Sequence, residues 1–418
     1  MMTPREASPV PYARTPKSRP GKSRKPRIAL ALAGGGPLGA IYEIGALCAL
    51  ADGLDGLDLN RCDHYVGVSA GGFIAAGLAN GISPRELCQA FIEDGSGRDN
   101  FDPAWLLKPA WAEFGSRLQR LPGLLGSALW AWGVQGKAFT HAFERLGAVI
   151  PTGVLDNEGI HQQIEHLFSL PGRTNDFRQL RARLTLVATQ LDTGDAAPFG
   201  QPGWDHVPIS RAIQASAALP GLFPPVEIEG QHYVDGALKK TLHATVALDD
   251  GAGLLLCLNP LVPFRAQAGR AQADHIPSLV EGGFPAVMSQ TFRSMIHSRL
   301  ELGMKHYERA YPGSDIVLIE PDQRDAKLFL ANTFSYRQRR ELAEHAYQQT
   351  RQMLLQRQAE LTPKLARHGV SLNLVSLRNP DLRLVSEPSV PAQTTLGRQL
   401  HATLDDLQRQ LGKPALGR

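Results

Sequence analysis

A serine between small residues is the first candidate for chemistry in this chain. The segment GVSAGG places Ser69 between Gly67 and Gly71 and so matches the pattern G-x-S-x-G. Small residues on both sides allow a tight turn from a strand into a helix, which presents the serine hydroxyl at the carboxyl edge of a sheet. The dipole of the helix that follows points its positive end at that hydroxyl. The pattern indicates a nucleophilic serine, although a buried turn of small residues has the same composition.

A serine nucleophile needs a base, and one aspartate is placed to serve as one. In the segment HYVDGAL an apolar strand leads to Asp235, and Gly236 turns the chain directly afterwards. A carboxylate there can take the proton of Ser69 if burial raises its proton affinity and the two side chains lie within hydrogen-bond reach. Taken alone, an Asp-Gly pair is typical of a β-turn.

Three consecutive glycines, Gly34, Gly35 and Gly36, follow the apolar segment IALALA. Acyl transfer develops a negative oxygen that backbone N–H groups must bind, and glycine lets successive amides point into one concavity. Gly34, Gly36 and Gly39 also match the dinucleotide pattern G-x-G-x-x-G. That pattern requires a strand ending in an acid about 20 residues further on, whereas the loop ADGLDGLDLN stands there. An oxyanion site is therefore favoured over a nucleotide site.

The order of apolar segments predicts an α/β core with a mainly parallel sheet. Strands are expected at 27–34, 63–69, 183–191, 225–234, 253–263 and 315–321, and helices at 39–52, 70–80, 209–219, 284–310 and 334–355. Only one strand and one helix precede Ser69, which does not fit the α/β-hydrolase fold. Beyond about residue 360 the pattern weakens to a surface helix and tail.

Composition indicates a globular protein of one large domain with appendages. The chain has 418 residues, of which 43% are hydrophobic and 20% charged, enough to bury a sizeable core. No apolar segment approaches the roughly 20 residues that cross a bilayer, and we find no secretory signal. Cys48, Cys62, Cys88 and Cys257 lack metal or redox spacing, so we expect reduced core residues in a cytoplasmic protein.

Two segments fall outside the α/β pattern. Residues 1–26 are basic and Pro-rich, and we expect a disordered leader. This leader either keeps the protein in solution or attracts it to anionic lipid, as a peripheral contact with the membrane. Residues 101–135 hold four of the five tryptophans. They form either a cap that meets an acyl chain or membrane interface, or a helical insertion with its tryptophans packed inward.

In their order, the blocks GGGPLG, GVSAG, ASAALPGLFPPV and DGAL resemble those of the patatin-like phospholipases, over roughly residues 27–320. The resemblance implies a three-layer α/β/α fold with a helical cap insertion, and hydrolysis of lipid esters by a Ser-Asp dyad without metal or cofactor. It implies Ser69 as nucleophile, Asp235 as base, and the amides of Gly35 and Gly36 as oxyanion donors.

The resemblance also implies roles for the remaining residues of the site. Gly67 and Gly71 form the turn around the nucleophile, Gly34 completes the oxyanion loop, and Gly39 and Gly236 support it. We interpret the block with Ser216 and Pro220 as structural support beside the dyad. His232 and His243 are interpreted as surface or packing residues, because the family needs no histidine.

One position departs from the family pattern. Many members carry Arg or Lys just before the last glycine of the first block, whereas this chain has Leu38. The missing cation removes a possible phosphate contact, so the resemblance leaves open whether phospholipids are preferred over other esters.

We therefore expect a leader at 1–26, a hydrolase domain at 27–320 with a helical insertion at about 95–150, and a helical extension and tail at 321–418. The expected partner is a lipid or ester substrate, and nucleic acid is not expected. Two other hypotheses remain: a lipid-surface binding or scaffold protein of the same fold without useful turnover, and a nucleotide-binding oxidoreductase.

Overall fold

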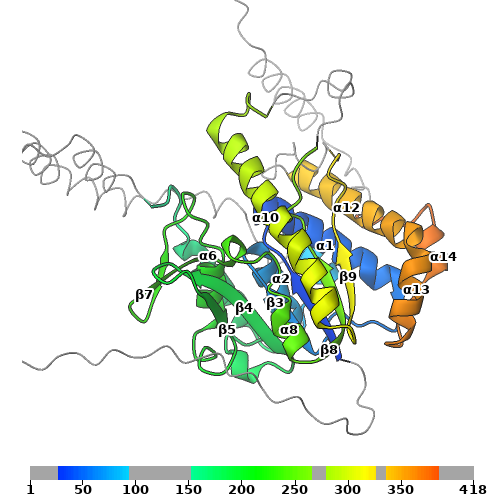
Figure 1. Cartoon of the computed structure of the whole chain (residues 1–418), viewed down its shortest axis with the longest axis horizontal. Helices are drawn as coiled ribbons and strands as arrows, with labels where there is room; N and C mark the ends of the chain where they lie inside the picture. Colours follow the sequence, from blue (N-terminus) through cyan, green and yellow to red (C-terminus); the bar gives the residue numbers. More distant parts are fainter. Residues whose placement is uncertain (1–26, 94–151, 266–278, 326–335, 386–418) are drawn as a thin grey trace, which may run out of the picture.

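The computed structural model describes residues 27–93, 152–265, 279–325 and 336–385. The predicted leader, the predicted insertion with its tryptophan-rich stretch, and residues 386–418 lie outside these ranges. In the described part, a twisted sheet lies between two layers of helices (Figure 1).

The central sheet has the strand order β6-β7-β4-β3-β1-β8-β9, with β5 paired to β4. Strands β4, β3, β1, β8 and β9 are parallel, whereas β5 and β7 run antiparallel to β4. The strands are Arg27–Leu32 (β1), His64–Gly67 (β3), Arg183–Gln190 (β4), Ala196–Phe199 (β5), Val226–Ile228 (β6), Gln231–Asp235 (β7), Ala252–Leu258 (β8) and Asp315–Ile319 (β9). A separate small pair joins Leu54–Asp55 (β2) to Ser371–Leu372 (β10). Each strand that the sequence predicts is found, and β5, β2 and β10 are additions.

The α-helices are Gly36–Gly53 (α1), Ala70–Ala79 (α2), Pro84–Phe91 (α3), Glu158–Phe168 (α6), Ile209–Ser216 (α7), Thr245–Asp249 (α8), Gly283–Ala310 (α10), Tyr336–Gln356 (α12), Gln358–Ala366 (α13) and Leu374–Arg378 (α14). Short 3₁₀ turns lie at Phe177–Gln179 (η2) and Gly236–Leu238 (η3). Helix α1 begins at Gly36, earlier than predicted, because Pro37 fits the first turn of a helix.

Alternating residues of β1 face the two helical layers, as the pleat of a strand requires. Leu30 and Leu32 belong to the core shared with α1, α2, α7 and α12. Ala29 and Ala31 face the opposite side, where they pack with side chains of α8 and α10 such as Tyr307. Both faces of the sheet are thus buried, and the predicted three-layer α/β/α class is confirmed.

Helix α12 is part of the first of these layers, since it shares its core with α1. The two helices approach so closely that a Cβ atom on Gly45 would lie 2.5 Å from the carbonyl oxygen of Ala343. Helix α12, which lies after residue 320, therefore packs directly on the α/β core.

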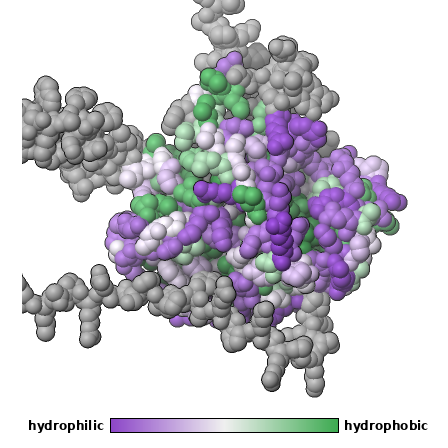
Figure 2. Space-filling model, viewed as in Figure 1, coloured by the Kyte–Doolittle hydropathy of each residue, from purple (hydrophilic) through white to green (hydrophobic). Residues whose placement is uncertain are grey.

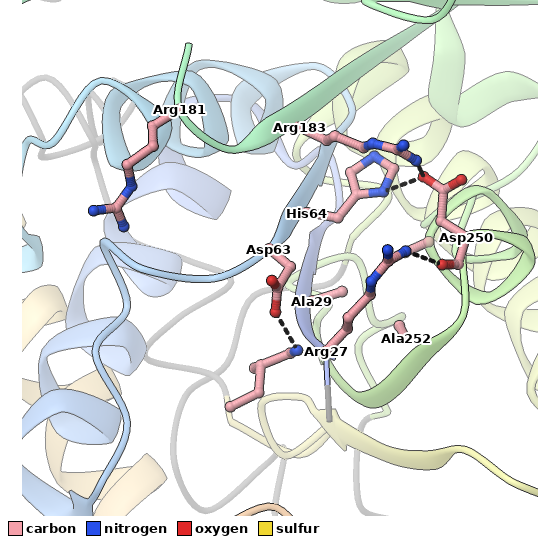
Figure 3. Close-up of a pocket in the computed structure, with 10 residues that line it drawn as sticks. Arg27, Ala29, Asp63, His64, Arg181, Arg183, Asp250 and Ala252 are labelled. Atoms are coloured by element: carbon pink, nitrogen blue, oxygen red, sulfur yellow. Dashed lines mark hydrogen bonds and ion pairs between the residues drawn. The ribbon is translucent and has the colours of Figure 1, made fainter. Parts of the chain in front are cut away.

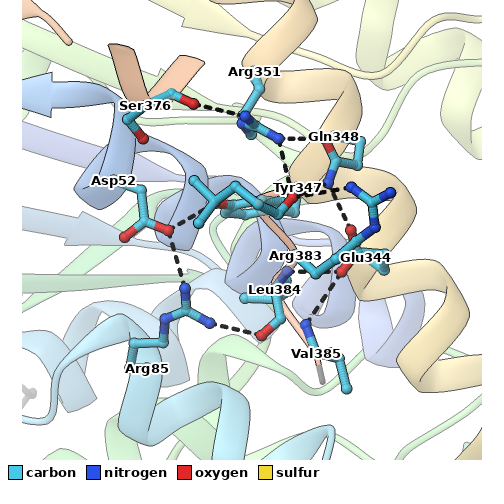
Figure 4. Close-up of polar contacts among 11 residues, drawn as sticks. Asp52, Arg85, Glu344, Tyr347, Gln348, Arg351, Ser376, Arg383, Leu384 and Val385 are labelled. Carbon is cyan, nitrogen blue, oxygen red and sulfur yellow. Dashed lines mark hydrogen bonds and ion pairs between the residues drawn. The ribbon is translucent and has the colours of Figure 1, made fainter. Parts of the chain in front are cut away.

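Polar side chains of α12 bind α14 and the segment that follows it (Figure 4). The buried guanidinium of Arg351 donates to the carbonyls of Ser376 and Asn379, at 2.7 and 2.6 Å. The carboxylate of Glu344 accepts the N–H group of Leu384 at 2.7 Å. Charge-assisted bonds of this kind hold a chain segment that has no regular structure of its own.

All four cysteines are buried and form no disulfide in the structure, which agrees with the predicted core positions. Among the described helices, none combines the length and the hydropathy needed to cross a bilayer.

Candidate active site

Ser69 lies in the turn between β3 and α2, as the G-x-S-x-G pattern predicts. Its backbone has φ 53 and ψ −126, a conformation that residues other than glycine rarely adopt. Such a conformation costs of order 1–3 kcal/mol and persists only where neighbours hold it. Ser69 is 7% exposed and stands at the N-terminus of α2, whose dipole favours negative charge.

The glycines of this turn are needed because other backbone segments press against it. A Cβ atom on Gly67 would lie 2.5 Å from Cα of Gly72, and one on Gly71 would lie 2.3 Å from the carbonyl oxygen of Ala33. Real Cβ atoms do not approach so closely, so the end of β1 packs on the turn through glycine. This contact brings the glycine loop after β1 beside Ser69.

Ser216, at the end of α7, holds the turn from the other side. Its hydroxyl accepts the N–H group of Ser69 at 2.8 Å and donates to the carbonyl of Val187 at 2.6 Å. Ser216 is fully buried, so both bonds are made out of contact with water. The contacts agree with the interpretation of its block as support beside the dyad.

Asp235 ends β7 and lies opposite Ala188 in β4. Its buried carboxylate lies next to the side chain of Ser69, and it accepts the N–H group of Ala237 at 2.8 Å. Burial raises the pKa of Asp235 to about 6, while the N–H group of Ala237 and the side chain of Ser69 oppose this rise. The structure thus brings together the two side chains that the sequence singles out, and the carboxyl holds a proton more readily than usual.

Gly236 fits between the carboxylate and the sheet, since a Cβ atom there would lie 2.1 Å from the carbonyl oxygen of Val187. Nε2 of His243 lies 3.2 Å from the carbonyl oxygen of Gly236, and the ring is buried. Burial lowers the pKa of His243 to about 4, so the ring is neutral at pH 7. His243 supports the turn, and His232 is exposed, in agreement with the packing and surface interpretation.

The glycine loop lies directly against Ser69. A Cβ atom on Gly34 would lie 2.8 Å from Cβ and 3.4 Å from Oγ of Ser69. Gly35 is the N-cap of α1 and Gly36, with φ +58, is its first residue. N–H groups in the first turn of a helix have no partner within that helix and can bind an anion. This loop can therefore offer donors next to the serine hydroxyl.

Pro260 supports the loop from β8, a contact that sequence reasoning missed. Its Cγ atom would lie 2.8 Å from a Cβ on Gly35 and 3.0 Å from a Cβ on Gly39. The Asn259-Pro260 pair lies inside the predicted strand 253–263, but β8 ends at Leu258, and the side chain of Asn259 accepts the N–H group of Leu261 at 3.1 Å. Gly39 is thus a packing position beneath the loop.

A cavity of about 210 Å³ lies at the opposite, amino edge of the sheet (Figure 3). Its charged side chains bind one another: Asp250 accepts Arg183 at 2.7 Å, and Nδ1 of His64 lies 3.0 Å from the same carboxylate oxygen. These bonds lower the pKa of Asp250 to about 2, and the bond with His64 contributes most to the lowering. Arg27 binds the backbone carbonyl of Asp250 at 2.6 Å. The cluster joins the amino ends of β1, β3, β4 and β8, at the edge of the sheet opposite Ser69.

No group of three or more His, Cys, Asp or Glu side chains in the described ranges is arranged to hold a metal ion. The groups described above around Ser69 are a buried carboxyl and the backbone N–H groups of the glycine loop.

Comparison with solved structures finds weak similarities. VipD from Legionella pneumophila is 17% identical with a TM-score of 0.38, and the match covers 80% of this chain and 67% of VipD. The type III effector ExoU is 16% identical with a TM-score of 0.30, and 80% of this chain matches 53% of ExoU. A further structure holds full-length ExoU in complex with full-length SpcU from Pseudomonas aeruginosa. Its match is 16% identical to this chain with a TM-score of 0.24, and it covers 92% of this chain and 69% of that one. This chain spans about half the length of ExoU in the first of these ExoU structures.

The comparison with family models is decisive. The model of the patatin-like phospholipases matches residues 30–248, a range that includes Ser69, Asp235 and the glycine loop. This range is more than half of the 418 residues. The chain belongs to the patatin-like phospholipase family.

Proposed function

We propose that this protein is a serine acyl hydrolase that cleaves carboxylic esters of lipids with Ser69 as nucleophile and Asp235 as base. One observation carries the proposal: Ser69, on a strained turn beside the glycine loop, lies next to the buried carboxylate of Asp235, whose pKa is raised to about 6. Membership of the family supports activity on lipid esters.

In the first half of the reaction, Oγ of Ser69 attacks the ester carbonyl carbon while its proton passes to Asp235. The carbonyl oxygen becomes negative, and the N–H groups of Gly34, Gly35 and Gly36 bind it. The intermediate collapses as the alcohol leaves with the proton from Asp235, and the acyl group stays on Ser69 as an ester. A carboxyl with a pKa near 6 suits both proton transfers near neutral pH.

In the second half, a water molecule attacks the acyl ester and Asp235 accepts the proton of that water. The same N–H groups bind the second oxyanion. The intermediate then releases the carboxylic acid, and Ser69 regains its proton from Asp235. One ester and one water thus yield one acid and one alcohol.

Leu38 bears on the substrate class. The leucine side chain is apolar and packs partly buried against the core. It therefore offers no charge to a phosphate. We therefore favour neutral glycerides and simple esters as substrates over strict dependence on a phosphate head group. Attraction of the basic leader to anionic membranes is a separate proposal, and deletion of residues 1–26 tests it by vesicle sedimentation at low and high salt.

A fluorophosphonate probe tests the proposal, because it reacts covalently with activated serines. We expect labelling of the wild type, no labelling of Ser69→Ala, and labelling of Ser83→Ala. Ser83 is a matched control, since it caps α3 through Glu86 and lies outside the turn between β3 and α2. Mass spectrometry should find the adduct on Ser69. An unlabelled wild type that still binds lipid would instead support the surface-binding hypothesis.

Loss of either member of the dyad should remove hydrolysis of a short-chain ester. Ser69→Ala and Asp235→Asn should each lower kcat at least about 10³-fold, and the double variant should cost little more, because the two residues act as a unit. Near wild-type turnover in either variant would contradict the proposed roles.

A further inference from the structure

Helix α10 extends beyond the catalytic edge of the sheet. Strand β8 ends at this edge and β9 begins at the other, so α10 between them starts at this edge and runs back along the sheet (Figure 1). Its residues Phe292 and Ile296 pack against Val68 and Ala237, the neighbours of the proposed dyad. The turns before Phe292 therefore project about 13 Å past that level, at 1.5 Å per residue.

Exposed apolar side chains lie on several segments at this edge. Val280, three residues before α10, and Val287, near the start of the helix, are 75% and 42% exposed. Leu191, directly after β4, is 49% exposed, and Leu222 and Val154 are 40% and 52% exposed. We call these five residues the apolar rim. Figure 2 shows hydrophobic surface at the projecting end of α10.

Contacts connect the rim to the site. The N–H group of Val154 donates to the carbonyl of Leu222 at 3.0 Å, in the loop that follows α7. In that same loop the carbonyl of Ala218 accepts the N–H group of Asp235 at 3.0 Å. The N–H group of Leu191 donates to the carbonyl of His232 in β7 at 2.8 Å, so the rim is built on the strands that carry Asp235.

The charges of the rim select the kind of surface that fits it. The segments 152–157, 191–195, 219–225 and 279–291 contain no Lys or Arg. Asp192 and Glu281 are exposed beside the rim, and Asp195 binds Lys239 at 3.1 Å. Acidic groups repel anionic lipid, so attraction here must come from burial of apolar surface. An uncharged bilayer accepts apolar side chains without opposing these carboxylates.

We propose that the apolar rim inserts into the surface of an uncharged phospholipid bilayer and thereby places Ser69 against lipid esters, a proposal that rests on the proposed function for its substrate. The bilayer then meets the molecule edge-on, at the carboxyl ends of the strands. Exposed apolar residues further along α10, such as Leu302, lie outside this contact.

The experiment measures sedimentation of the full chain with phosphatidylcholine vesicles, in the Ser69→Ala background so that no lipid is consumed. Val287→Asp and Leu191→Asp should each weaken binding about tenfold or more, because an aspartate must then enter the bilayer interface. Two matched controls should bind like the parent: Leu302→Asp, on the same helix about 22 Å further along, and Val375→Asp on α14. Both control side chains are more exposed than Val287, at 67% and 87%.

Binding should not weaken between 0.1 and 0.5 M salt, in contrast to attraction by the basic leader. In a chain that retains Ser69, Val287→Asp should hydrolyse a soluble short-chain ester at a rate within about twofold of the wild type. Such a rate would show that the site is intact. Equal binding of all variants, equal losses in the controls, or a strict need for anionic lipid would overturn the proposal. So would light scattering that shows the rim joining two copies of the chain. Vesicle binding by the apolar rim without any ester turnover would contradict the proposed function and would still support the rim as a membrane-binding surface.

Discussion

The side chain of Ser216 fixes the backbone of Ser69. Its Oγ lies 2.8 Å from the amide nitrogen of Ser69 and 2.6 Å from the carbonyl oxygen of Val187. One buried hydroxyl thus connects the turn of the nucleophile to β4, on which Asp235 is paired. The relative position of the two candidate catalytic side chains depends on this connection.

Ser216→Ala should lower kcat for ester hydrolysis about tenfold or more, with a smaller change in KM. The substitution leaves the buried N–H group of Ser69 without an acceptor, which costs about 1–3 kcal/mol and releases the strained turn. Ser210→Ala is the matched control, because Ser210 is buried on the same helix and binds Asn175. The control should lose stability but keep kcat. Equal kcat in Ser216→Ala and the wild type would show that the bond does not position Ser69.

The pH profile should report the ionisation of Asp235. Below its pKa of about 6 the carboxyl holds a proton and cannot accept that of Ser69. We expect kcat/KM for a neutral soluble ester to fall tenfold per pH unit below about pH 6 and to be level above it. Circular dichroism over the same range separates this fall from unfolding. A profile without a step between pH 5 and 7 would contradict the assignment of Asp235 as base.

Gly34→Ala should damage catalysis through a single methyl group. The new Cβ atom would lie 2.8 Å from Cβ of Ser69, so the loop or the serine must move. We expect kcat to fall at least about 10²-fold, because oxyanion donors act on charge that exists mainly in the transition state. Gly72→Ala, in α2, is the control: its nearest contact would be 3.4 Å, to Cδ2 of Leu186, and alanine favours a helix. A change in KM alone for Gly34→Ala would point to a ground-state contact.

The sequence was sufficient for the local part of the site. The turn around Ser69 and the glycine loop depend on small residues at fixed spacing, and these are visible in the chain itself. The contact of Asp235 with Ser69 depends on strand pairing between distant segments, so the sequence nominates the aspartate without a distance. Resemblance to a family supplied that link.

Other features had no clear signal in the sequence. The short strand β5 contains Pro198, which is typical of a loop or an edge strand. The amphipathic pattern of α12 indicates one buried face but not its partner, α1. Glu43 interrupts an apolar helix pattern, and a charged residue ordinarily marks the solvent side. Only the packed structure shows that Glu43 is fully buried.

Glu43 leads to the last prediction, which concerns stability. The side chain is fully buried in α1, and neither carboxyl oxygen has a hydrogen-bond partner among the described residues. Burial holds the pKa of Glu43 well above its usual range, an effect that the nearby N–H group of Ala33 offsets only in part. The folded protein therefore keeps this carboxyl protonated at pH values where the unfolded chain has already lost the proton.

The sign of the pH dependence follows from that difference. Because the pKa is raised in the folded state, the contribution of Glu43 to stability is largest below the unfolded value of about 4.3 and declines as pH rises above it. Glu43→Met, of similar length and without polar atoms, should be more stable than the wild type by about 1–3 kcal/mol at pH 8, and the gain should shrink toward pH 4. Asp235 also has a raised pKa but remains in both proteins, so their difference isolates Glu43. The control is Glu165→Met, at an exposed position of α6, which should change stability little at either pH. Denaturant unfolding at pH 4 and pH 8 gives the comparison, and a less stable Glu43→Met at pH 8 would show that the buried carboxyl has a partner that holds the fold together.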